Sequence, residues 1–312
     1  MKIENFGLGI PSLYKKESVD NRVMAMLESV RGTWMQEQYI QVMAQEWPSE
    51  EIQRLKDTFK EYPNLHIYER GRVPIAPDIR LEMMKASKVN FLHIIDDDRK
   101  FSSHSKAMEV YENAVSQSLQ AFKDIPELNS VSFQFGGMDK HFNKLTIGFS
   151  ARTCSQLGRI YSIDRILNTA VEEFFRLCWN IEDVCYGASV ALSGGLCGRI
   201  KMTPNIQEVK DNSSSFNTSG KPFGVSISNR LWEMYYMFAF LDDNVAEYER
   251  ISSKYDDKYN VVPGFSLFYP GPWHEGKLKR VFEERDKFLE SNPESSKFET
   301  IKHLMDNFHS RC

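Results

Sequence analysis

Three consecutive aspartates, Asp96, Asp97 and Asp98, directly follow an apolar run near the end of the first third of the chain. The run Val89–Ile95 has only two polar interruptions, which is typical of a buried central strand. Ligands of open α/β sheets bind outside the carboxyl ends of the strands, where this triplet is expected to lie. Because adjacent carboxylates repel one another unless a cation or solvent relieves the repulsion, the triplet predicts a metal site. The competing interpretation is a solvated loop that caps the next helix.

The composition is that of an ordinary globular protein. The chain has 312 residues, of which 41% are hydrophobic and 26% charged, enough for one large α/β domain or two modest ones. A formal net charge of −4 gives no overall electrostatic reason to expect nucleic-acid binding, although a local basic groove would be hidden in that sum.

The cysteines and the first residues predict the compartment. Five cysteines, with no Cys-x-x-Cys pair among them, indicate reduced thiols and argue against structural zinc. The start of the sequence has no apolar leader, and no apolar run reaches the roughly 18 residues needed to span a bilayer. These features favour a cytoplasmic protein without a transmembrane segment.

The first hundred residues alternate between strand and helix patterns. Apolar, β-prone runs predict strands over 3–10, 39–44 and 65–68, followed by the strand that ends at the triplet. Helical periodicity separates them, and Ser49 is expected to cap one of the helices. This order predicts a mainly parallel sheet with crossover helices on its faces.

The second half does not repeat this order. Residues 130–135 alternate as a strand, with 145–149 as the expected hairpin partner across two glycines. From residue 277 onward two apolar stripes predict two helices. We therefore expect a catalytic domain over 1–276, with C-terminal helices over 277–312 packed on it.

Several common enzyme classes lack their central motif. The segment Gly7–Ser12 resembles a dinucleotide-binding turn only superficially, because its sixth position is serine and Pro11 would stiffen it. The chain also has no Walker lysine motif and no Gly-x-Ser-x-Gly elbow.

The aspartate triplet resembles the Asp-x-Asp motif of the metal-dependent nucleotide-sugar glycosyltransferases with the GT-A fold. Many members of that superfamily carry an arginine about sixteen positions earlier, where this chain has Arg80 (96 − 80 = 16). The neighbours of Arg80 depart from the family pattern, and an ordinary surface charge on a helix is the alternative. The resemblance implies a Rossmann-like, mostly parallel central sheet flanked by helices, with a smaller antiparallel sheet on the acceptor side.

The resemblance also implies roles for the residues around the triplet. Asp96 and Asp98 would bind Mn²⁺ or Mg²⁺, since hard carboxylate oxygens suit these ions. Asp97 would point elsewhere, toward the nucleoside ribose. Pro11 and Arg80 would lie at the bound nucleotide.

A second resemblance lies far downstream, in the segment 270–277. It is similar to the Pro-Trp-His element with which some enzymes of this fold complete metal coordination, so His274 would be a third metal ligand and Lys277 would approach the diphosphate. The alternative is a Pro/Gly turn that starts a helix, with a solvated histidine.

A third resemblance concerns the pair Glu182 and Asp183. Inverting GT-A enzymes place such a pair at this stage of the chain, with one carboxylate serving as the base toward the acceptor hydroxyl. Asp183 is the preferred base and Glu182 its partner. The alternative is that Asp183 caps the helix that follows.

Together these residues predict a metal-dependent glycosyltransferase that moves a sugar from a nucleotide diphosphate sugar to an acceptor hydroxyl, with inversion. The acceptor would be a glycan, a lipid-linked glycan or a small molecule. A phage-type enzyme that glycosylates hydroxymethylated DNA bases is the first alternative, and it would need a basic groove. A nucleotidyltransferase or a non-catalytic nucleotide-sugar binding protein is the second. The sequence leaves the oligomeric state open.

Overall fold

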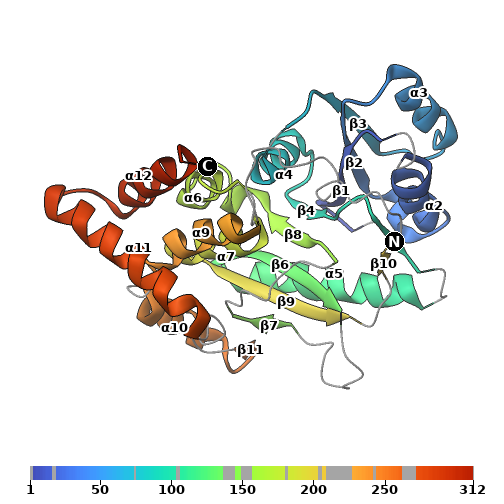
Figure 1. Cartoon of the computed structure of the whole chain (residues 1–312). Helices are drawn as coiled ribbons and strands as arrows, with labels where there is room; N and C mark the ends of the chain where they lie inside the picture. The colour runs from blue at the N-terminus through green and yellow to red at the C-terminus, as the bar shows by residue number, and fades with distance from the viewer. Residues whose placement is uncertain are drawn as a thin grey trace.

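The structure is a computed structural model of the whole chain (Figure 1). It describes residues 3–15, 19–73, 75–102, 106–135, 145–148, 157–179, 182–202, 206–208, 227–241, 244–261 and 272–311. No helix within these ranges is both long and apolar enough to cross a membrane.

In these ranges nine strands form one sheet, in the order β11-β7-β9-β6-β8-β4-β1-β2-β3. Their bounds are β1 (Phe6–Leu13), β2 (Tyr39–Gln45), β3 (Leu65–Arg70), β4 (Phe91–Ile94), β6 (Leu128–Phe135), β7 (Thr146–Ile147), β8 (Arg159–Ser162), β9 (Leu196–Met202) and β11 (Asn260–Val261). A second, antiparallel sheet pairs β5 (Arg99–Phe101) with β10 (Ile206–Glu208).

Helices flank the large sheet (Figure 1). Those of the first half are η1 (Val19–Met24), α2 (Ala25–Val30), η2 (Trp34–Glu37), α3 (Ser49–Thr58), α4 (Ala76–Ala86) and α5 (Ala107–Asp124). Those of the second half are η3 (Ile163–Arg165), α6 (Ala170–Arg176), α7 (Glu182–Leu192), α9 (Ile227–Phe238), α10 (Val245–Ser252), η5 (Ser253–Tyr255), α11 (Pro272–Ser291) and α12 (Lys297–His309).

The first four long strands confirm the prediction of a parallel sheet. β1 lies between β2 and β4 and is parallel to both, and β3 continues the sheet beyond β2. Parallel neighbours bring their carboxyl ends to the same edge of a sheet, so the residues that follow β1, β2 and β4 lie near one another. The second half departs from this pattern, because β8 runs antiparallel to both of its neighbours, β4 and β6.

Two glycines in β1 allow close contacts, Gly9 with α4 and Gly7 with the neighbouring strand β2. A methyl group added at Gly9 would lie 2.8 Å from the Met83 side chain of α4, and one added at Gly7 would lie 2.6 Å from the Tyr39 carbonyl oxygen of β2. These glycines therefore serve close packing within the fold, which agrees with the rejection of a dinucleotide-binding turn.

Apolar side chains cover both faces of the sheet. One cluster joins alternate residues of β1, such as Leu8 and Ile10, to α2, α3 and α5. The other joins Leu92 and Ile94 of β4 to α4, α6 and α7. Since both faces are buried, the central strands read as nearly continuous apolar runs in the sequence.

His93 is a polar residue in the middle of this core. Its side chain is fully buried on β4, with Nδ1 2.5 Å from the Tyr111 hydroxyl of α5 and Nε2 2.9 Å from the Leu157 carbonyl oxygen. Burial lowers the pKa of His93 from its usual 6.5 to about 3. The imidazole is therefore neutral in the folded protein and joins β4 to α5 just before the triplet.

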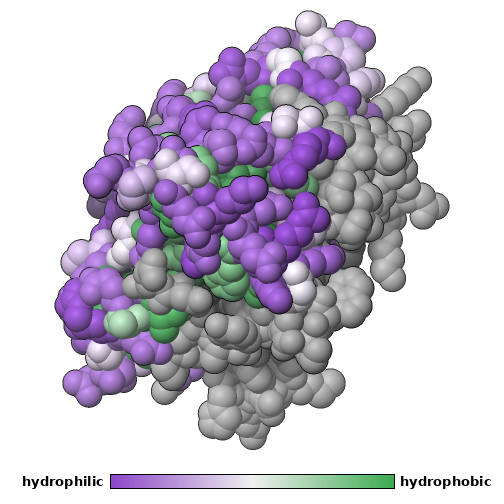
Figure 2. Space-filling view, turned by 60° about the vertical axis from the view of Figure 1, so that its left-hand side comes forward, coloured by the Kyte–Doolittle hydropathy of each residue, from purple (hydrophilic) through white to green (hydrophobic). Residues whose placement is uncertain are grey.

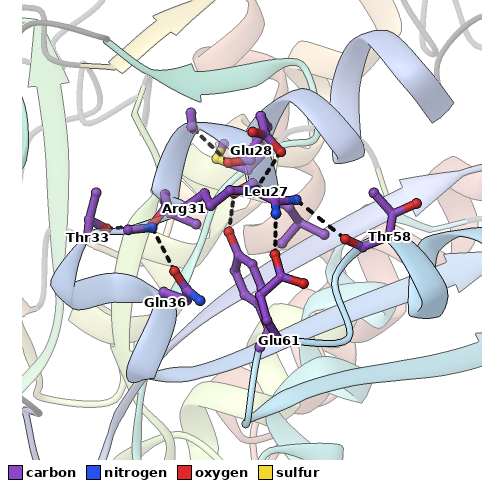
Figure 3. A network of polar contacts seen from close by, with 12 residues as sticks. Leu27, Glu28, Arg31, Thr33, Gln36, Thr58 and Glu61 are labelled. Carbon is purple, nitrogen blue, oxygen red and sulfur yellow. Dashed lines mark hydrogen bonds and ion pairs between the residues drawn. The ribbon is translucent and has the colours of Figure 1, made fainter.

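A polar network on the surface holds α2 to the segment after α3 (Figure 3). Arg31 forms ion pairs with Glu28 and with Glu61, and the Tyr62 hydroxyl donates a 2.7 Å hydrogen bond to the Leu27 carbonyl oxygen. Gly32, which has a positive φ of 70°, follows the C-cap residue Arg31 at the end of α2.

Two local predictions are wrong. The N-cap of α3 is Pro48, and the cap makes no side-chain hydrogen bond, so Ser49 is the first helical residue and not the cap. The expected hairpin between 130–135 and 145–149 does not form, because β7 pairs with β9 and β11, whereas β6 pairs with β8 and β9. Both edges of β6 are therefore occupied by β8 and β9, which leaves no edge for β7.

The C-terminal helices α11 and α12 form as predicted. Val281, Ile301, Met305 and Phe308 are buried, and they pack in the same apolar cluster as α9. The predicted domain boundary after residue 276 falls inside α11. On the side of the molecule to which these helices belong, Figure 2 shows mostly hydrophilic side chains with apolar ones gathered in seams between them.

We expect His93 to make the protein less stable in acid. Its folded-state pKa of about 3 lies below the usual 6.5, so the unfolded chain binds more protons between these two values and stability falls as the pH drops through this window. Urea unfolding at a series of pH values should show a steeper loss for the wild type than for His93→Gln, by up to about 1.4 kcal/mol per pH unit. Parallel pH profiles of the unfolding free energy in the wild type and His93→Gln would contradict a buried neutral histidine.

Candidate active site

The aspartate triplet lies at the carboxyl end of β4, next to β1. The Ile95 N–H donates a 2.9 Å hydrogen bond to the Gly9 carbonyl oxygen, which holds the two chains together beyond the last residue of β4. A turn follows, in which the Arg99 N–H donates to the Asp96 carbonyl oxygen at 3.2 Å, and the chain then enters β5. The triplet therefore connects the large sheet to the small antiparallel one.

The side chain of Asp97 points into the protein. Its Oδ2 accepts a 2.6 Å hydrogen bond from the Ser12 hydroxyl at the end of β1, and its Oδ1 lies 3.2 Å from Nη1 of Arg22 in η1. Both Asp97 and Arg22 are buried. Burial raises the pKa of Asp97 to about 6, although the Ser12 hydrogen bond and the Arg22 charge act in the opposite direction.

The two outer aspartates are more accessible. The side chain of Asp96 is 55% exposed and that of Asp98 is 30% exposed, against 10% for Asp97. Asp96 Oδ1 lies 3.1 Å from Nη2 of Arg80 in α4, and Asp98 Oδ1 lies 3.3 Å from Nε of Arg99. Asp96 is thus exposed and Asp98 partly exposed, with its Oδ1 buried, while Asp97 is held inside.

Each carboxylate of the triplet has its own arginine, which relieves the repulsion expected from the sequence. The alternative in which the triplet caps the next helix does not hold. That helix, α5, begins at Ala107, and its N-cap is Lys106 without a side-chain hydrogen bond.

The outer carboxylates fit a divalent cation that also binds a substrate phosphate. Mg²⁺ and similar ions are often held by one or two carboxylates, with the remaining positions filled by water and phosphate oxygens. Among the residues that the structure describes, no group of three or more His, Cys, Asp or Glu side chains could hold a metal by itself. Asp96 and Asp98 would therefore need further ligands, such as water or phosphate oxygens, to hold a cation.

The other predicted residues lie on several elements. Pro11 is in β1, directly before Ser12, at the carboxyl edge that carries the triplet. Lys277 is in α11, with its Nζ 6.0 Å from the centre of the Trp232 ring of α9. His274 belongs to the first turn of α11, and its side chain lies outside the described part of the structure.

Glu182 and Asp183 are the first two residues of α7, and their side chains also lie outside the described part. As the second helical residue, Asp183 follows the N-cap position, so the expectation that it might cap this helix does not hold.

A buried arginine connects α7 to the strand that carries the triplet. Arg159, at the start of β8, pairs in register with Ile94 of β4. Its guanidinium carbon lies 4.5 Å from the centre of the Tyr186 ring of α7. Tyr186 is one helical turn after Glu182, so the first turn of α7 is linked to the edge at which the triplet begins.

Some residues of this region were not recognised from the sequence, namely Ser12, Arg22, Arg159, Tyr14 and Trp47. Ser12 follows Pro11 at a strand end and could have been recognised from its position. Arg22 and Arg159 carry no local signal, because each meets its partner only after strands distant in the sequence pair. Tyr14 and Trp47 follow β1 and β2, and their rings lie 6.5 Å apart at the same edge.

Comparison with solved structures identifies the architecture. Residues 1–349 of S. aureus TarS, in complex with UDP-GlcNAc, align over 100% of this chain and 92% of that one, with a TM-score of 0.51 and 9% identity. The mannosyltransferase PcManGT from Pyrobaculum calidifontis, in complex with GDP-Man and Mn²⁺, aligns over 97% of this chain and 84% of that one, with a TM-score of 0.50 and 10% identity. The chain has the GT-A glycosyltransferase fold.

This likeness confirms the fold expected from the resemblance in the sequence. The mostly parallel central sheet, the flanking helices and the smaller antiparallel sheet are all present in the GT-A arrangement. No known protein family and no curated protein matches the sequence itself. At 9% and 10% identity the solved structures establish the fold alone, and the roles of individual residues depend on the geometry described above.

We expect the Arg22–Asp97 pair to be important for stability. Replacing one partner of a buried ion pair leaves an uncompensated charge, so Arg22→Met should lower the free energy of unfolding by about 3–5 kcal/mol. The double variant Arg22→Met/Asp97→Leu should recover much of this loss, because it removes both charges. Urea unfolding of the wild type, Arg22→Met, Asp97→Leu and the double variant measures the coupling free energy between the two side chains.

Arg31 offers a matched control for this test. It also pairs with carboxylates close to α2, but its side chain is 38% exposed. Arg31→Met should cost less than about 1 kcal/mol, as exposed pairs do. Equal losses of unfolding free energy in Arg22→Met and Arg31→Met would show that the buried Arg22–Asp97 pair contributes no more to stability than an exposed pair.

Proposed function

We propose that the protein is a glycosyltransferase that uses a nucleotide diphosphate sugar and Mn²⁺ or Mg²⁺. The observation that carries this proposal is the arrangement of the triplet in a GT-A fold, with Asp96 and Asp98 accessible and Asp97 held inside by Ser12 and Arg22. The likeness to solved structures with bound UDP-GlcNAc and with GDP-Man and Mn²⁺ supports the donor class.

The proposed donor site lies at the carboxyl edge of β1, β2 and β4. Asp96 and Asp98 would hold the cation, and Arg80 keeps Asp96 in place. A divalent cation bound there would stabilise the negative charge that grows on the diphosphate as the sugar leaves. Arg80 and Arg99 would add positive charge close to the same group.

The aromatic residues at this edge suit the nucleoside. Trp47 is buried, and its indole Nε1 has no hydrogen-bond partner among the described residues. Tyr14 contacts it edge-on from the end of β1. Flat apolar surfaces beside a polar edge are what a nucleobase requires, so these two residues would form one wall of its site.

The acceptor hydroxyl would be activated from α7. In the proposed reaction the Asp183 carboxylate removes the hydroxyl proton while the oxygen attacks the anomeric carbon, and the nucleoside diphosphate departs on the opposite side. This displacement inverts the anomeric centre. The acceptor class we propose is the hydroxyl of a glycan, a lipid-linked glycan or a small molecule.

The donor site can be tested by ligand-dependent stability. We expect one nucleoside diphosphate among UDP, GDP and TDP, or the monophosphate CMP, to stabilise the protein in the presence of Mn²⁺. At about 100 times its dissociation constant the ligand should add roughly 2.7 kcal/mol to the free energy of unfolding, which is visible as a thermal shift. The variant Asp96→Ala/Asp98→Ala should lose the metal-dependent part of the shift.

Asp256 and Asp257 provide the control, because they form an exposed acidic pair in a turn far along the chain. Replacing both by alanine should leave the shift unchanged. The proposal fails if no nucleotide stabilises the folded wild-type protein, or if both double variants respond in the same way.

The base can be tested once the donor is known. Asp183→Asn should lower kcat by about 10²- to 10⁴-fold, the usual contribution of a general base, while the nucleotide-induced thermal shift stays as in the wild type. Glu182→Gln should have the smaller effect. The measurement is the release of nucleoside diphosphate with a panel of acceptors, and a kcat that survives in Asp183→Asn but not in Glu182→Gln would exchange the two roles.

A further inference from the structure

Glu233 is a carboxylate in the core of the C-terminal half, far along the chain from the aspartate triplet. It lies on α9 and is fully buried. Its Oε2 accepts a 3.0 Å hydrogen bond from the backbone N–H of Trp179, and its Oε1 lies 3.1 Å from Nε2 of His309 at the end of α12. A buried carboxylate is costly unless such partners compensate it, so these contacts define its position.

Trp179 and His309 also contact each other directly. Their rings stack with centres 3.7 Å apart and planes inclined by only 13°. The His309 side chain is 7% exposed, so the contact is largely removed from solvent. One carboxylate and one ring pair therefore join three parts of the chain, namely α9, the end of α12 and Trp179, which lies three residues before α7.

The position of Trp179 connects this cluster to the proposed reaction. Trp179 lies three residues before Glu182 and four before Asp183, at the entry to α7. On the other side of these residues, Tyr186 is held by the Arg159 guanidinium, 4.5 Å from its ring centre. Described contacts thus lie on both sides of the first turn of α7, with Glu233 at Trp179 before it and Arg159 at Tyr186 after it.

Docking of α12 alone does not account for this arrangement. Apolar side chains, among them Ile301, Met305 and Phe308, already bury one face of α12. A buried contact between a carboxylate and an imidazole is a weak source of stability compared with apolar residues of similar volume. Beyond the apolar packing of α12, the polar contacts fix the orientation of the backbone at Trp179.

We propose that Glu233 and His309 are positioning residues, which fix the first turn of α7 and with it the carboxylate of Asp183. This inference rests on the proposed function, in which Asp183 is the base. A small displacement of a reacting group can lower a rate by as much as about 100-fold, so the contact would act on kcat and leave the donor contacts of the triplet intact.

The experiment compares Glu233→Ala, His309→Phe and the conservative Glu233→Gln. Glu233→Ala removes both contacts, and His309→Phe keeps a ring on Trp179 but removes the nitrogen that meets Glu233. We expect kcat to fall about 10- to 100-fold in these two variants, with donor KM and the nucleotide-induced thermal shift unchanged. Glu233→Gln retains an oxygen for the Trp179 N–H and should keep most of the activity.

Hydrogen exchange supplies a readout that does not depend on activity. Peptides covering residues 177–186 should exchange faster in Glu233→Ala and His309→Phe than in the wild type. Glu284 is the matched control, because it is a carboxylate on α11 that accepts a 2.8 Å hydrogen bond from the Tyr236 hydroxyl of α9. Glu284→Ala should change neither kcat nor exchange at 177–186.

The outcomes separate this inference from the proposed function. Normal kcat and normal exchange at 177–186 in both variants would overturn the inference, as would an equal loss of donor binding and kcat, which indicates general destabilisation. If Glu233→Ala does not fold, His309→Phe carries the same test. Absence of nucleotide binding in the wild type would contradict the proposed function. Faster exchange at 177–186 in the variants would still show that Glu233 and His309 hold the start of α7 in place.

Discussion

Compensation of negative charge is the constraint on which the site depends. Three carboxylates in a row repel one another, and positive charge placed beside them lowers the cost of this repulsion. The fold meets this requirement with arginines from three different places, namely η1, α4 and the start of β5. The buried pair of Arg22 and Asp97 matters most, because it fixes the direction of the middle side chain and so turns its neighbours outward.

The sheet brings the remaining parts of the site to the same edge. β1, β2 and β4 are parallel, so Ser12, Trp47 and the triplet meet there although they are separated along the chain. The antiparallel strand β8 then connects this region to α7 through Arg159. The proposed donor region and the proposed acceptor region thus belong to one core, and Glu233 of α9 contacts Trp179 on the chain before α7.

The sequence predicts the elements better than it predicts their partners. The run before Asp96 predicts a buried strand because it is short, apolar and rich in β-prone residues. The stripe with Ile301 and Met305 predicts α12 because its apolar residues recur at helical spacing. The predicted hairpin partner of β6 was wrong because the strands that pair with β6, namely β8 and β9, come later in the sequence than the segment 145–149. Arg22 lies 75 residues before Asp97, and nothing in the sequence around either residue indicates that they meet.

The missing side chain at Gly9 gives the packing of the sheet an electrostatic consequence. Met83 lies against this position, and Arg80 is one turn earlier on the same helix, where it holds Asp96. A larger residue at Gly9 would require the terminal methyl group of Met83 to move, which would disturb the packing of α4 one turn from Arg80. The arginine that pairs with Asp96 is therefore carried by a helix whose contact with the sheet depends on a missing side chain.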